Sequence, residues 1–338
     1  MADVFGGQCW REASAVSDAK LRTLCLELKD LAFRSKERST SNKYSAAFTR
    51  WARWTTNFPE VKVIPANPLH VAAYFNHLAK TSGFSAVESA YYAISWYHKL
   101  SDFPDPTLHN LPTQVKEGIK RKLGKPPVRK AHATLGLVKD IICMASASNQ
   151  LIDLRLATMS ALSFSGFLRF NDISNIRVGD ISLTPEKLEL LLRKSKTDVY
   201  SQGQSIVIAR SGKTTCPVAL LEDYLRRANP SELHGPQSFI FRAIQGSGSK
   251  SKLKRQNKPI SYSRAREIFL KAVKDLGYDA KLYGLHSLRS GGTTAAAASG
   301  VDHALLKKHG RWKSDSAKDL YVRFSQDKLN SVSKSTGL

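Results

Sequence analysis

The sequence predicts a mainly α-helical protein with a small antiparallel β-sheet in its C-terminal half, divided into two domains. The chain has 338 residues, and a domain typically takes about 100–200 residues. Apolar residues recur every three to five positions in the N-terminal part of the chain, which indicates amphipathic helices. In the second half, two short apolar runs flank a turn-forming segment, and this pattern predicts a β-hairpin among helices.

The composition excludes several classes of protein. The formal net charge is +24, with 52 Lys and Arg against 28 Asp and Glu, which favours phosphate backbones or anionic membranes as partners. No apolar run approaches the roughly 18–20 residues of a spanning helix, and residues 1–10 lack a signal-peptide pattern. Cys9, Cys25, Cys143 and Cys216 have no C-x-x-C spacing, so we expect reduced thiols and no zinc site. We therefore expect a soluble, intracellular, basic protein that does not bind a membrane.

Residues 1–110 are predicted to form a bundle of four helices. The apolar positions are, helix by helix, Val16, Leu21, Leu24, Leu28 and Leu31; Tyr44, Phe48, Trp51 and Trp54; Val71, Phe75 and Leu78; and Val87, Tyr91, Ile94 and Tyr97. This spacing places them on one face of each helix, so we expect the aromatic residues in the core rather than on a base-stacking surface. Residues 103–106, Phe-Pro-Asp-Pro, end the bundle because proline does not continue a helix.

Residues 111–133 are predicted to be a basic linker between the two domains. The stretch 116–130 reads KEGIKRKLGKPPVRK, with seven Lys or Arg and one acidic residue, and it is broken by two prolines. Such a charge run is either a solvated helix face with a linker or a connector that neutralises phosphates between two DNA-bound domains. Both interpretations put the domain boundary here.

Residues 134–325 are predicted to form the second domain. The expected helices span 135–147, 151–165, 216–228, 261–274, 287–299, 303–309 and 314–324. Strands are expected at 188–194 and 205–209, joined across 197–204, and a shorter strand at 238–241. Residues 247–258 carry five Lys or Arg and no acid, and they are predicted to be a loop. Residues 326–338 form a tail that either docks on a neighbouring protomer or frays.

Several phosphate and metal motifs are incomplete. Gly212, Lys213 and Thr214 resemble the end of a P-loop, but its first glycine would stand at the position of Val207. A dinucleotide fingerprint beginning at residue 246 fails because residue 251 is a serine. The nine histidines form no metal-ligand spacing, and no H-E-x-x-H occurs. We therefore expect neither nucleotide hydrolysis nor a metal centre.

What remains is a scattered set of cationic and aromatic residues. Arg169 follows an apolar helix, with Asp172 three residues on, the spacing of an ion pair on one helix face. His286 and Arg289 stand three apart at a predicted helix start, where both face one anion. Lys196, Trp312 and Tyr321 complete the set. Taken singly, each residue is equally well explained as a surface charge, a helix cap or a packing residue.

Together, these residues resemble the active site of the tyrosine recombinases, the phage-integrase family, in a Cre-like arrangement. The family combines Arg, Lys, His-x-x-Arg, a His or Trp, and a nucleophilic Tyr; here Arg169, Lys196, His286, Arg289, Trp312 and Tyr321 stand in that order. Trp312 precedes Tyr321 by nine residues, whereas His309 precedes it by twelve. Because nine fits the family pattern, we assign the His or Trp role to Trp312 and keep His309 as the alternative. The stretch GFLRFNDISNI also resembles recombinases of eukaryotic mobile elements.

The resemblance implies a fold and a mechanism. Residues 1–110 correspond to a helical core-binding domain and residues 134–325 to the catalytic domain, and the two close on duplex DNA as a C-shaped clamp. Tyr321 would attack the scissile phosphate to give a 3′-phosphotyrosyl enzyme, so no cofactor, metal or ATP is expected. Arg169 and Arg289 would hold the phosphate oxygens, and Lys196 would protonate the leaving 5′-oxygen. His286 would assist proton transfer or bind the phosphate. Trp312 would donate its N–H to the phosphate or pack the helix that carries Tyr321, and Asp172 would orient Arg169 from behind.

The implied partners are double-stranded DNA and other copies of the chain, as a homo-tetramer on two paired sites. The candidate DNA contacts are Lys43, Arg50, Lys80, Lys120, Arg121, Lys122, Arg129 and Lys130. Two alternatives stay open: a DNA-binding protein that has lost catalysis, and a type IB topoisomerase with the same nicking-closing chemistry. The compartment would be the nucleus in a eukaryote, or the cytoplasm and nucleoid in a bacterium.

Overall fold

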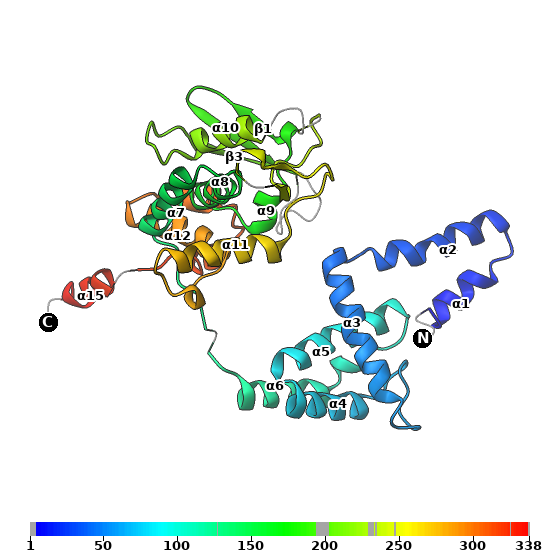
Figure 1. The fold of residues 1–338 in the computed structure, drawn as a ribbon. Helices are drawn as coiled ribbons and strands as arrows, with labels where there is room; N and C mark the ends of the chain where they lie inside the picture. Colours follow the sequence, from blue (N-terminus) through cyan, green and yellow to red (C-terminus); the bar gives the residue numbers. More distant parts are fainter. Residues whose placement is uncertain are drawn as a thin grey trace. The chain divides into compact units, whose positions relative to one another are not determined.

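The computed structural model describes residues 5–126, 128–193, 203–228, 233, 235–246, 248–324 and 326–336 (Figure 1). The chain divides into two compact units, Met1–Pro127 and Val128–Leu338. The first unit contains helices alone among its described residues, and the second combines helices with small antiparallel sheets. The predicted fold class, mainly α with a small antiparallel sheet in the C-terminal domain, is confirmed. No helix in the described part of the chain is both long and apolar enough to cross a membrane.

The first unit is a helical bundle with an aromatic core. Its elements are α1 (Gln8–Ala15), α2 (Ala19–Phe33), α3 (Arg38–Thr55), α4 (Pro68–Thr81), α5 (Phe84–Leu100), a 3₁₀ turn (Pro106–Leu108) and α6 (Asn110–Leu123). Trp51 on α3, Phe75 on α4 and Ile94 on α5 are fully buried. Phe48 and Tyr97 stack with ring centroids 3.9 Å apart. The aromatic residues of these three helices therefore serve packing, as their spacing predicts.

Helix α2 departs from the sequence expectation. Its N-terminus is capped as predicted for a helix, because the Asp18 carboxylate accepts a hydrogen bond from the backbone N–H of Leu21. None of its residues is buried, however, and Leu21, Leu24, Leu28 and Leu31 are 49–63% exposed. Among the hydrophobic residues of α2, only Ala32 and Phe33 pack against the core of the unit. The leucine stripe is therefore an unpartnered apolar face rather than part of the core.

The expected linker is partly helical. Residues 110–123 form α6, which packs against α4 and α5 and therefore belongs to the first unit. Pro112 is buried, and Val115 and Ile119 pack against the aromatic core, because the apolar residues of this stretch recur at helical spacing among the charges. The boundary between the units falls between residues 127 and 128, inside the predicted linker but well after its expected start.

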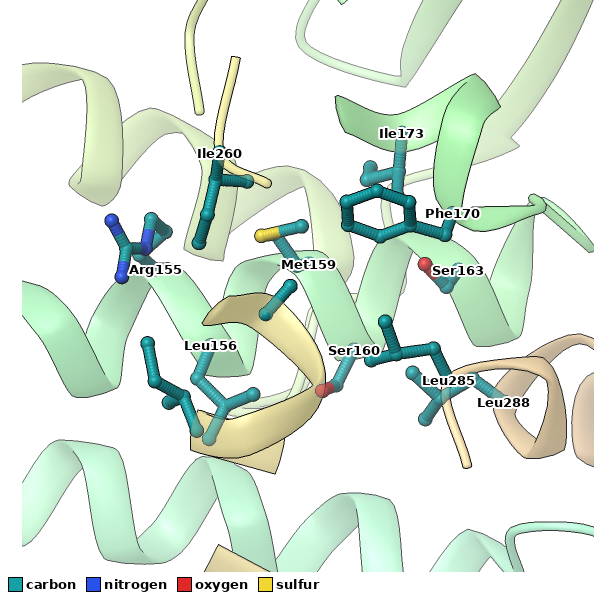
Figure 2. A pocket seen from close by; sticks show the side chains of 12 residues that line it. Arg155, Leu156, Met159, Ser160, Ser163, Phe170, Ile173, Ile260, Leu285 and Leu288 are labelled. Atoms are coloured by element: carbon teal, nitrogen blue, oxygen red, sulfur yellow. The ribbon is translucent and has the colours of Figure 1, made fainter. Parts of the chain in front are cut away.

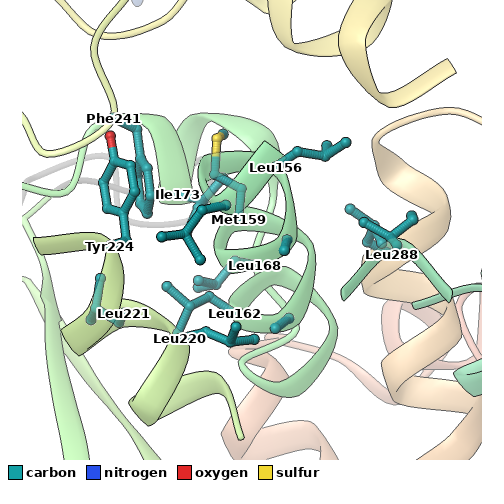
Figure 3. Packing of buried hydrophobic residues seen from close by; sticks show 14 of the residues in the cluster. Leu156, Met159, Leu162, Leu168, Ile173, Leu220, Leu221, Tyr224, Phe241 and Leu288 are labelled. Atoms are coloured by element: carbon teal, nitrogen blue, oxygen red, sulfur yellow. The ribbon is translucent and has the colours of Figure 1, made fainter. Parts of the chain in front are cut away.

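The second unit is built around one central helix. Its helices are α7 (Leu135–Ser148), α8 (Leu151–Ser165), α9 (Phe170–Ser174), α10 (Pro217–Arg227), α11 (Tyr262–Asp275), α12 (His286–Ala298), α13 (His303–Gly310), α14 (Asp315–Asp319) and α15 (Gln326–Lys334), with 3₁₀ turns at Val178–Asp180, Gly248–Lys250 and Ala280–Leu282. Helix α8 is buried along most of its length and packs against α7, α10 and α12. Figure 3 shows Leu162 and Met159 of α8 beside Leu221 and Tyr224 of α10. This packing fixes the end of α8, where the first candidate arginine follows.

A three-stranded antiparallel sheet, in the order β1-β2-β3, covers part of this core. It comprises β1 (Ile181–Leu183), β2 (Lys187–Leu192) and β3 (Gln204–Ala209). Leu188 and Leu190 of β2 face the core and pair with Ile208 and Ile206 of β3. The predicted hairpin is present, and β1 is an additional strand that the sequence analysis did not identify.

Three other predicted elements differ from the structure. Residues 238–241 form one isolated bridge, Arg177 to Phe239, rather than a strand, because that chain segment has no continuous partner. Instead, β4 (Ile244–Gln245) pairs with β5 (Lys252–Leu253), and β5 lies inside the expected basic loop, 247–258. The predicted helix 314–324 is only α14, which begins at the Ser314 cap and ends at Asp319, so Tyr321 lies on a turn after the helix.

Candidate active site

The first candidate arginine stands on a turn that joins two helices. The chain leaves α8 through Gly166, Phe167 and Leu168, and Arg169 caps the N-terminus of the short helix α9. Asp172 Oδ2 accepts a hydrogen bond from the backbone N–H of Arg169 at 3.0 Å. The Arg169 side chain is 15% exposed. A buried helix on one side and a capped helix on the other thus hold this arginine in place.

Arg289 lies one turn into α12 and is completely buried. Its Nη1 atom donates to the carbonyl of Phe167, and its Nη2 atom donates to the carbonyl of Gly310 at 2.7 Å. Burial, and then the nearby Arg169 and Arg311 charges, lower the pKa of Arg289 to about 9. The group therefore stays protonated at neutral pH, and its charge lacks a direct carboxylate partner among the described residues.

His286 and Tyr321 form a pair on the more exposed side of Arg289. The Nε2 atom of His286 lies 2.9 Å from the Tyr321 hydroxyl. The Arg289 guanidinium carbon lies 4.9 Å from the centre of the Tyr321 ring. Thr294 of α12 holds the backbone on both sides of this turn, donating to the Tyr321 carbonyl and accepting from the Arg323 N–H, each at 3.1 Å. The turn after α14 is therefore attached to the same helix that carries His286 and Arg289.

The geometry separates the two candidates for the His or Trp role. Trp312 packs its ring 4.5 Å from the Arg289 guanidinium and 5.2 Å from the Tyr321 ring. His309 lies on the other side, where its Nε2 atom bonds to the carbonyl of Ser165 at 2.8 Å. Burial, above all, lowers the pKa of His309, so it is a neutral donor to that carbonyl. The structure thus brings Trp312, and not His309, against Tyr321.

Four buried donors at this place have no hydrogen-bond partner among the described residues. They are Arg169 Nη1, Arg289 Nε, Arg311 Nε and Trp312 Nε1. All are N–H groups, and three belong to arginines; Asp172 lies within 4.0 Å of two of these, Arg169 and Arg311, and the third, Arg289, has no carboxylate partner among the described residues. Unpaired buried donors are costly, and an excess of positive charge makes an anion the natural occupant. The site therefore fits a phosphate group.

Asp172 has a different main partner from the one expected. Its Oδ2 atom lies 4.0 Å from Arg169 Nη1, too far for a hydrogen bond, but 3.2 Å from Arg311 Nη2. Asp172 therefore positions Arg169 mainly through the backbone N–H, and its charge is taken up by Arg311. The sequence analysis overlooked Arg311, although a cation immediately before Trp312 was a usable signal.

The remaining candidate residues lie on other elements than this cluster or outside the described part of the chain. Lys196 lies outside the described part of the chain, between β2 and β3. The eight proposed DNA contacts are all exposed, on α3, at the end of α4, on α6 and in the segment 128–130. Lys130 of that segment donates to the carbonyl of Lys281. Among the described residues, no group of three or more His, Cys, Asp or Glu is arranged to hold a metal ion.

Two hollows border the site without containing it. Figure 2 shows a small cavity of about 20 Å³, lined by apolar residues of α8, α9 and α12 together with Arg155 and Ser160. Its lining includes Phe170, Leu285 and Leu288, which are sequence neighbours of the site residues, but none of the described candidate residues. A larger groove of about 620 Å³ lies among α8, β3, α12 and α13. Arg169, Arg289 and Tyr321 therefore line neither the small cavity nor the larger groove.

Comparison with known proteins places this geometry in a family. The model of the phage integrase family matches residues 138–328, which is more than half of the chain and includes all six predicted catalytic positions. The chain belongs to the phage integrase family. This tyrosine recombinase is 27% identical over 321 residues to an integrase/recombinase XerD homolog of Selenomonas ruminantium, covering 91% of this chain and 89% of the relative. The resemblance and the reaction class predicted from the sequence, site-specific DNA recombination, are confirmed.

Solved structures share the fold of this recombinase at low sequence identity. XerH site-specific recombinase bound to palindromic difH substrate has a TM-score of 0.63 at 11% identity, covering 96% of this chain and 87% of XerH. A lambda integrase tetramer bound to a Holliday junction has a TM-score of 0.56 at 17% identity, with coverages of 93% and 80%. The Tn1549 transposon integrase in complex with transposon right-end DNA has a TM-score of 0.54 at 11% identity, with coverages of 90% and 95%.

Proposed function

We propose that Tyr321 is the nucleophile with which this recombinase cleaves and rejoins double-stranded DNA. The 2.9 Å contact between His286 Nε2 and the Tyr321 hydroxyl carries the proposal. It lies within the range in which a base takes a proton from its partner. With Nε2 unprotonated, His286 accepts the phenol proton as the oxygen attacks phosphorus. The Arg289 charge, 4.9 Å from the Tyr321 ring, favours the phenolate that forms.

The unpartnered donors supply the phosphate site. Arg169 Nη1 and Arg289 Nε bind the non-bridging oxygens of the scissile phosphate, and the Trp312 indole N–H adds a third donor. These donors are held in place before substrate arrives, so they stabilise the extra charge of the pentavalent transition state without reorganising. Attack gives a 3′-phosphotyrosyl bond and a free 5′-hydroxyl. That bond retains the energy of the phosphodiester, so rejoining needs no nucleotide.

Lys196 is proposed as the general acid. It stands in the sequence between the residues of β2 and those of β3, and a lysine can donate a proton to the leaving 5′-oxygen. The family match and the relatives named above favour this recombinase reaction over the type IB topoisomerase alternative. All six predicted catalytic positions carry the residue type that the reaction needs, which favours an active recombinase over a DNA-binding protein that has lost catalysis.

DNA is held by the exposed cations of both units. Lys43 and Arg50 stand seven residues apart on α3, which places them on one helix face, and Lys120, Arg121 and Lys122 lie in the last turn of α6. These cations, together with those of 128–130, would each neutralise a phosphate of the duplex. Phosphate contacts of this kind position the protein and carry no sequence information. The protein would act inside the cell, where its DNA substrate is.

We further propose that recombination takes place in a tetramer on two paired sites. Two apolar surfaces of the chain support assembly. The first is the leucine stripe of α2, defined above, which the first unit does not cover. The second is the 620 Å³ groove, which suits the exposed Leu329 and Val332 of α15 from a neighbouring protomer.

Sedimentation of the DNA complex tests the role of α2. The double variant Leu24→Glu with Leu28→Glu should form a smaller assembly on DNA than wild type. Unchanged sedimentation would contradict the assignment of α2.

A suicide-substrate trap tests the reaction itself. Nicked duplexes drawn from the DNA flanking the gene lose a short fragment after cleavage, so rejoining is blocked and the covalent complex accumulates. Wild type should give a denaturation-resistant adduct, and Tyr321→Phe should bind the same duplex without forming one. Tyr44→Phe, at a tyrosine far along the sequence from the motif, is the matched control and should form the adduct. An adduct with Tyr321→Phe would place the nucleophile elsewhere.

A further inference from the structure

Arg311 has an unusual backbone and an unusual environment. It follows α13 with φ +57° and ψ +40°, the left-handed conformation that a side chain other than glycine's rarely adopts. The residue is also buried, at 7% exposure. A cation in a disfavoured conformation and away from water persists only when the surrounding structure holds it there.

The contacts of Arg311 converge on one short segment. Its Nη1 atom donates to the carbonyls of Gly166 at 3.3 Å and of His309 at 3.2 Å. Its Nη2 atom donates to the carbonyl of Phe167 at 3.3 Å and to Asp172 Oδ2 at 3.2 Å. Two of these four acceptors belong to the turn between α8 and α9, and a third, Asp172, belongs to α9 itself, so the guanidinium joins this segment to the end of α13.

The same turn holds both proposed phosphate-binding arginines. Arg169 follows it directly, and the carbonyl of Phe167 also accepts a hydrogen bond from Arg289. Phe167 is itself in the left-handed region, with φ +48°. Two left-handed residues, Phe167 and Arg311, are thus linked through one carbonyl, which determines where Arg289 is anchored.

By pairing with Asp172, Arg311 leaves the positive charge of Arg169 available for a substrate phosphate. Asp172 is the carboxylate of this cluster, and it lies 3.2 Å from Arg311 but 4.0 Å from Arg169. A carboxylate that paired with Arg169 instead would occupy the donors that a phosphate needs. With Arg311 in place, the Arg169 Nη1 donor is left without a hydrogen-bond partner in the described structure.

We propose that Arg311 is a positioning residue for DNA cleavage. It binds the Asp172 carboxylate and the carbonyls of Gly166 and Phe167, and thereby keeps the Arg169 and Arg289 donors placed and available for the scissile phosphate. This inference rests on the proposed function, because it assigns Arg311 a part in the same phosphate site. Arg311 itself does not touch the phosphate.

The test compares Arg311→Gly, Asp172→Asn and the double variant by single-turnover cleavage of the suicide substrate at saturating DNA. Glycine suits the left-handed backbone, so Arg311→Gly removes the guanidinium without straining the turn. Asparagine retains an oxygen for the Arg169 N–H but loses the charge. Each single variant should cleave about 10- to 100-fold more slowly, the scale of a misplaced reacting group. Because part of each effect acts through the shared Arg311–Asp172 contact, the loss in the double variant should be clearly smaller than the product of the two single losses.

DNA affinity and the thermal midpoint separate positioning from general damage. In Arg311→Gly the DNA affinity should stay near wild type, whereas the thermal midpoint should fall because the buried Asp172 carboxylate loses its partner, so cleavage is compared at a temperature at which every variant is folded. Arg226→Ala, which breaks an exposed Arg–Asp pair of the same unit, should cleave normally. Arg311→Lys reaches Asp172 without bridging the carbonyls, so it should cleave at an intermediate rate; it carries the test if the glycine variant unfolds. Wild-type cleavage in Arg311→Gly or Arg311→Lys, multiplicative effects, or a loss explained by unfolding would each overturn the inference. No adduct with wild type would instead overturn the proposed function, and this inference with it.

Discussion

Replacing Arg289 by lysine should slow cleavage without weakening DNA binding. The arginine uses Nη1 and Nη2 to bond the Phe167 and Gly310 carbonyls and keeps Nε for the phosphate. A lysine has one ammonium group, so satisfying both carbonyls leaves no donor in the place of Nε. Losing one preorganised donor costs about 10²–10³ in rate, or roughly 2.7–4 kcal/mol in the barrier. The Arg289→Lys variant should therefore cleave at about 0.1–1% of the wild-type rate.

Replacing Arg289 by alanine should lower the stability of the fold as well as the rate of cleavage. The change leaves the buried Gly310 carbonyl without the Arg289 donor, while the Phe167 carbonyl keeps its hydrogen bond from Arg311, so the free energy of unfolding should fall by about 1–3 kcal/mol. Single-turnover cleavage, DNA binding by fluorescence anisotropy and thermal unfolding separate these effects. Cleavage by Arg289→Lys within about threefold of wild type, or a loss of rate that comes entirely from weaker DNA binding, would show that Arg289 Nε does not bind the phosphate.

Three further predictions concern binding, stability and the indole donor. Neutralising Lys120, Arg121 and Lys122 should reduce the slope of log affinity against log salt by about 2.7, from about 0.9 per phosphate contact, in a salt titration; an unchanged slope removes them from the interface. Burial lowers the pKa of His98 in the folded protein. The stabilisation that neutral His98 gives the folded protein is therefore full above about pH 6.5 and is lost as the pH falls through the folded-state pKa. Thermal midpoints measured at several pH values should show this loss, and they should depend less on pH in His98→Gln. Trp312→Phe keeps the ring but loses the N–H, and should slow cleavage about 10- to 100-fold with little loss of stability; an unchanged rate would make Trp312 a packing residue only.

Helices such as α3, α4 and α5 were predictable because their apolar spacing matches their buried faces, whereas α1 and the short α9 were not predicted. The α2 leucines show the limit of that signal. Leu21 and Leu28 have the periodicity of a core helix, yet they are exposed, since periodicity identifies an apolar face and not what covers it. The same applies to α6, where dense charge suggested a linker while Val115 and Ile119 packed against the core.

The candidate site was predictable where residue type and order carry the chemistry. Arg169, His286, Arg289, Trp312 and Tyr321 were recognisable along the chain, although only the fold shows that they meet. The contacts of Arg311 were not predictable. They depend on two left-handed residues and on backbone carbonyls about 145 positions away, and neither leaves a pattern in the sequence.

The most direct test of the central claim is to identify the amino acid that becomes linked to DNA. The wild-type adduct from the suicide substrate should be digested with protease and nuclease, and the nucleotide-bearing peptide sequenced by mass spectrometry. We expect one modified residue, Tyr321, joined to a 3′-phosphate, with a 5′-hydroxyl on the released fragment. A nucleotide on any other residue, or a link to a 5′-phosphate, would contradict that claim.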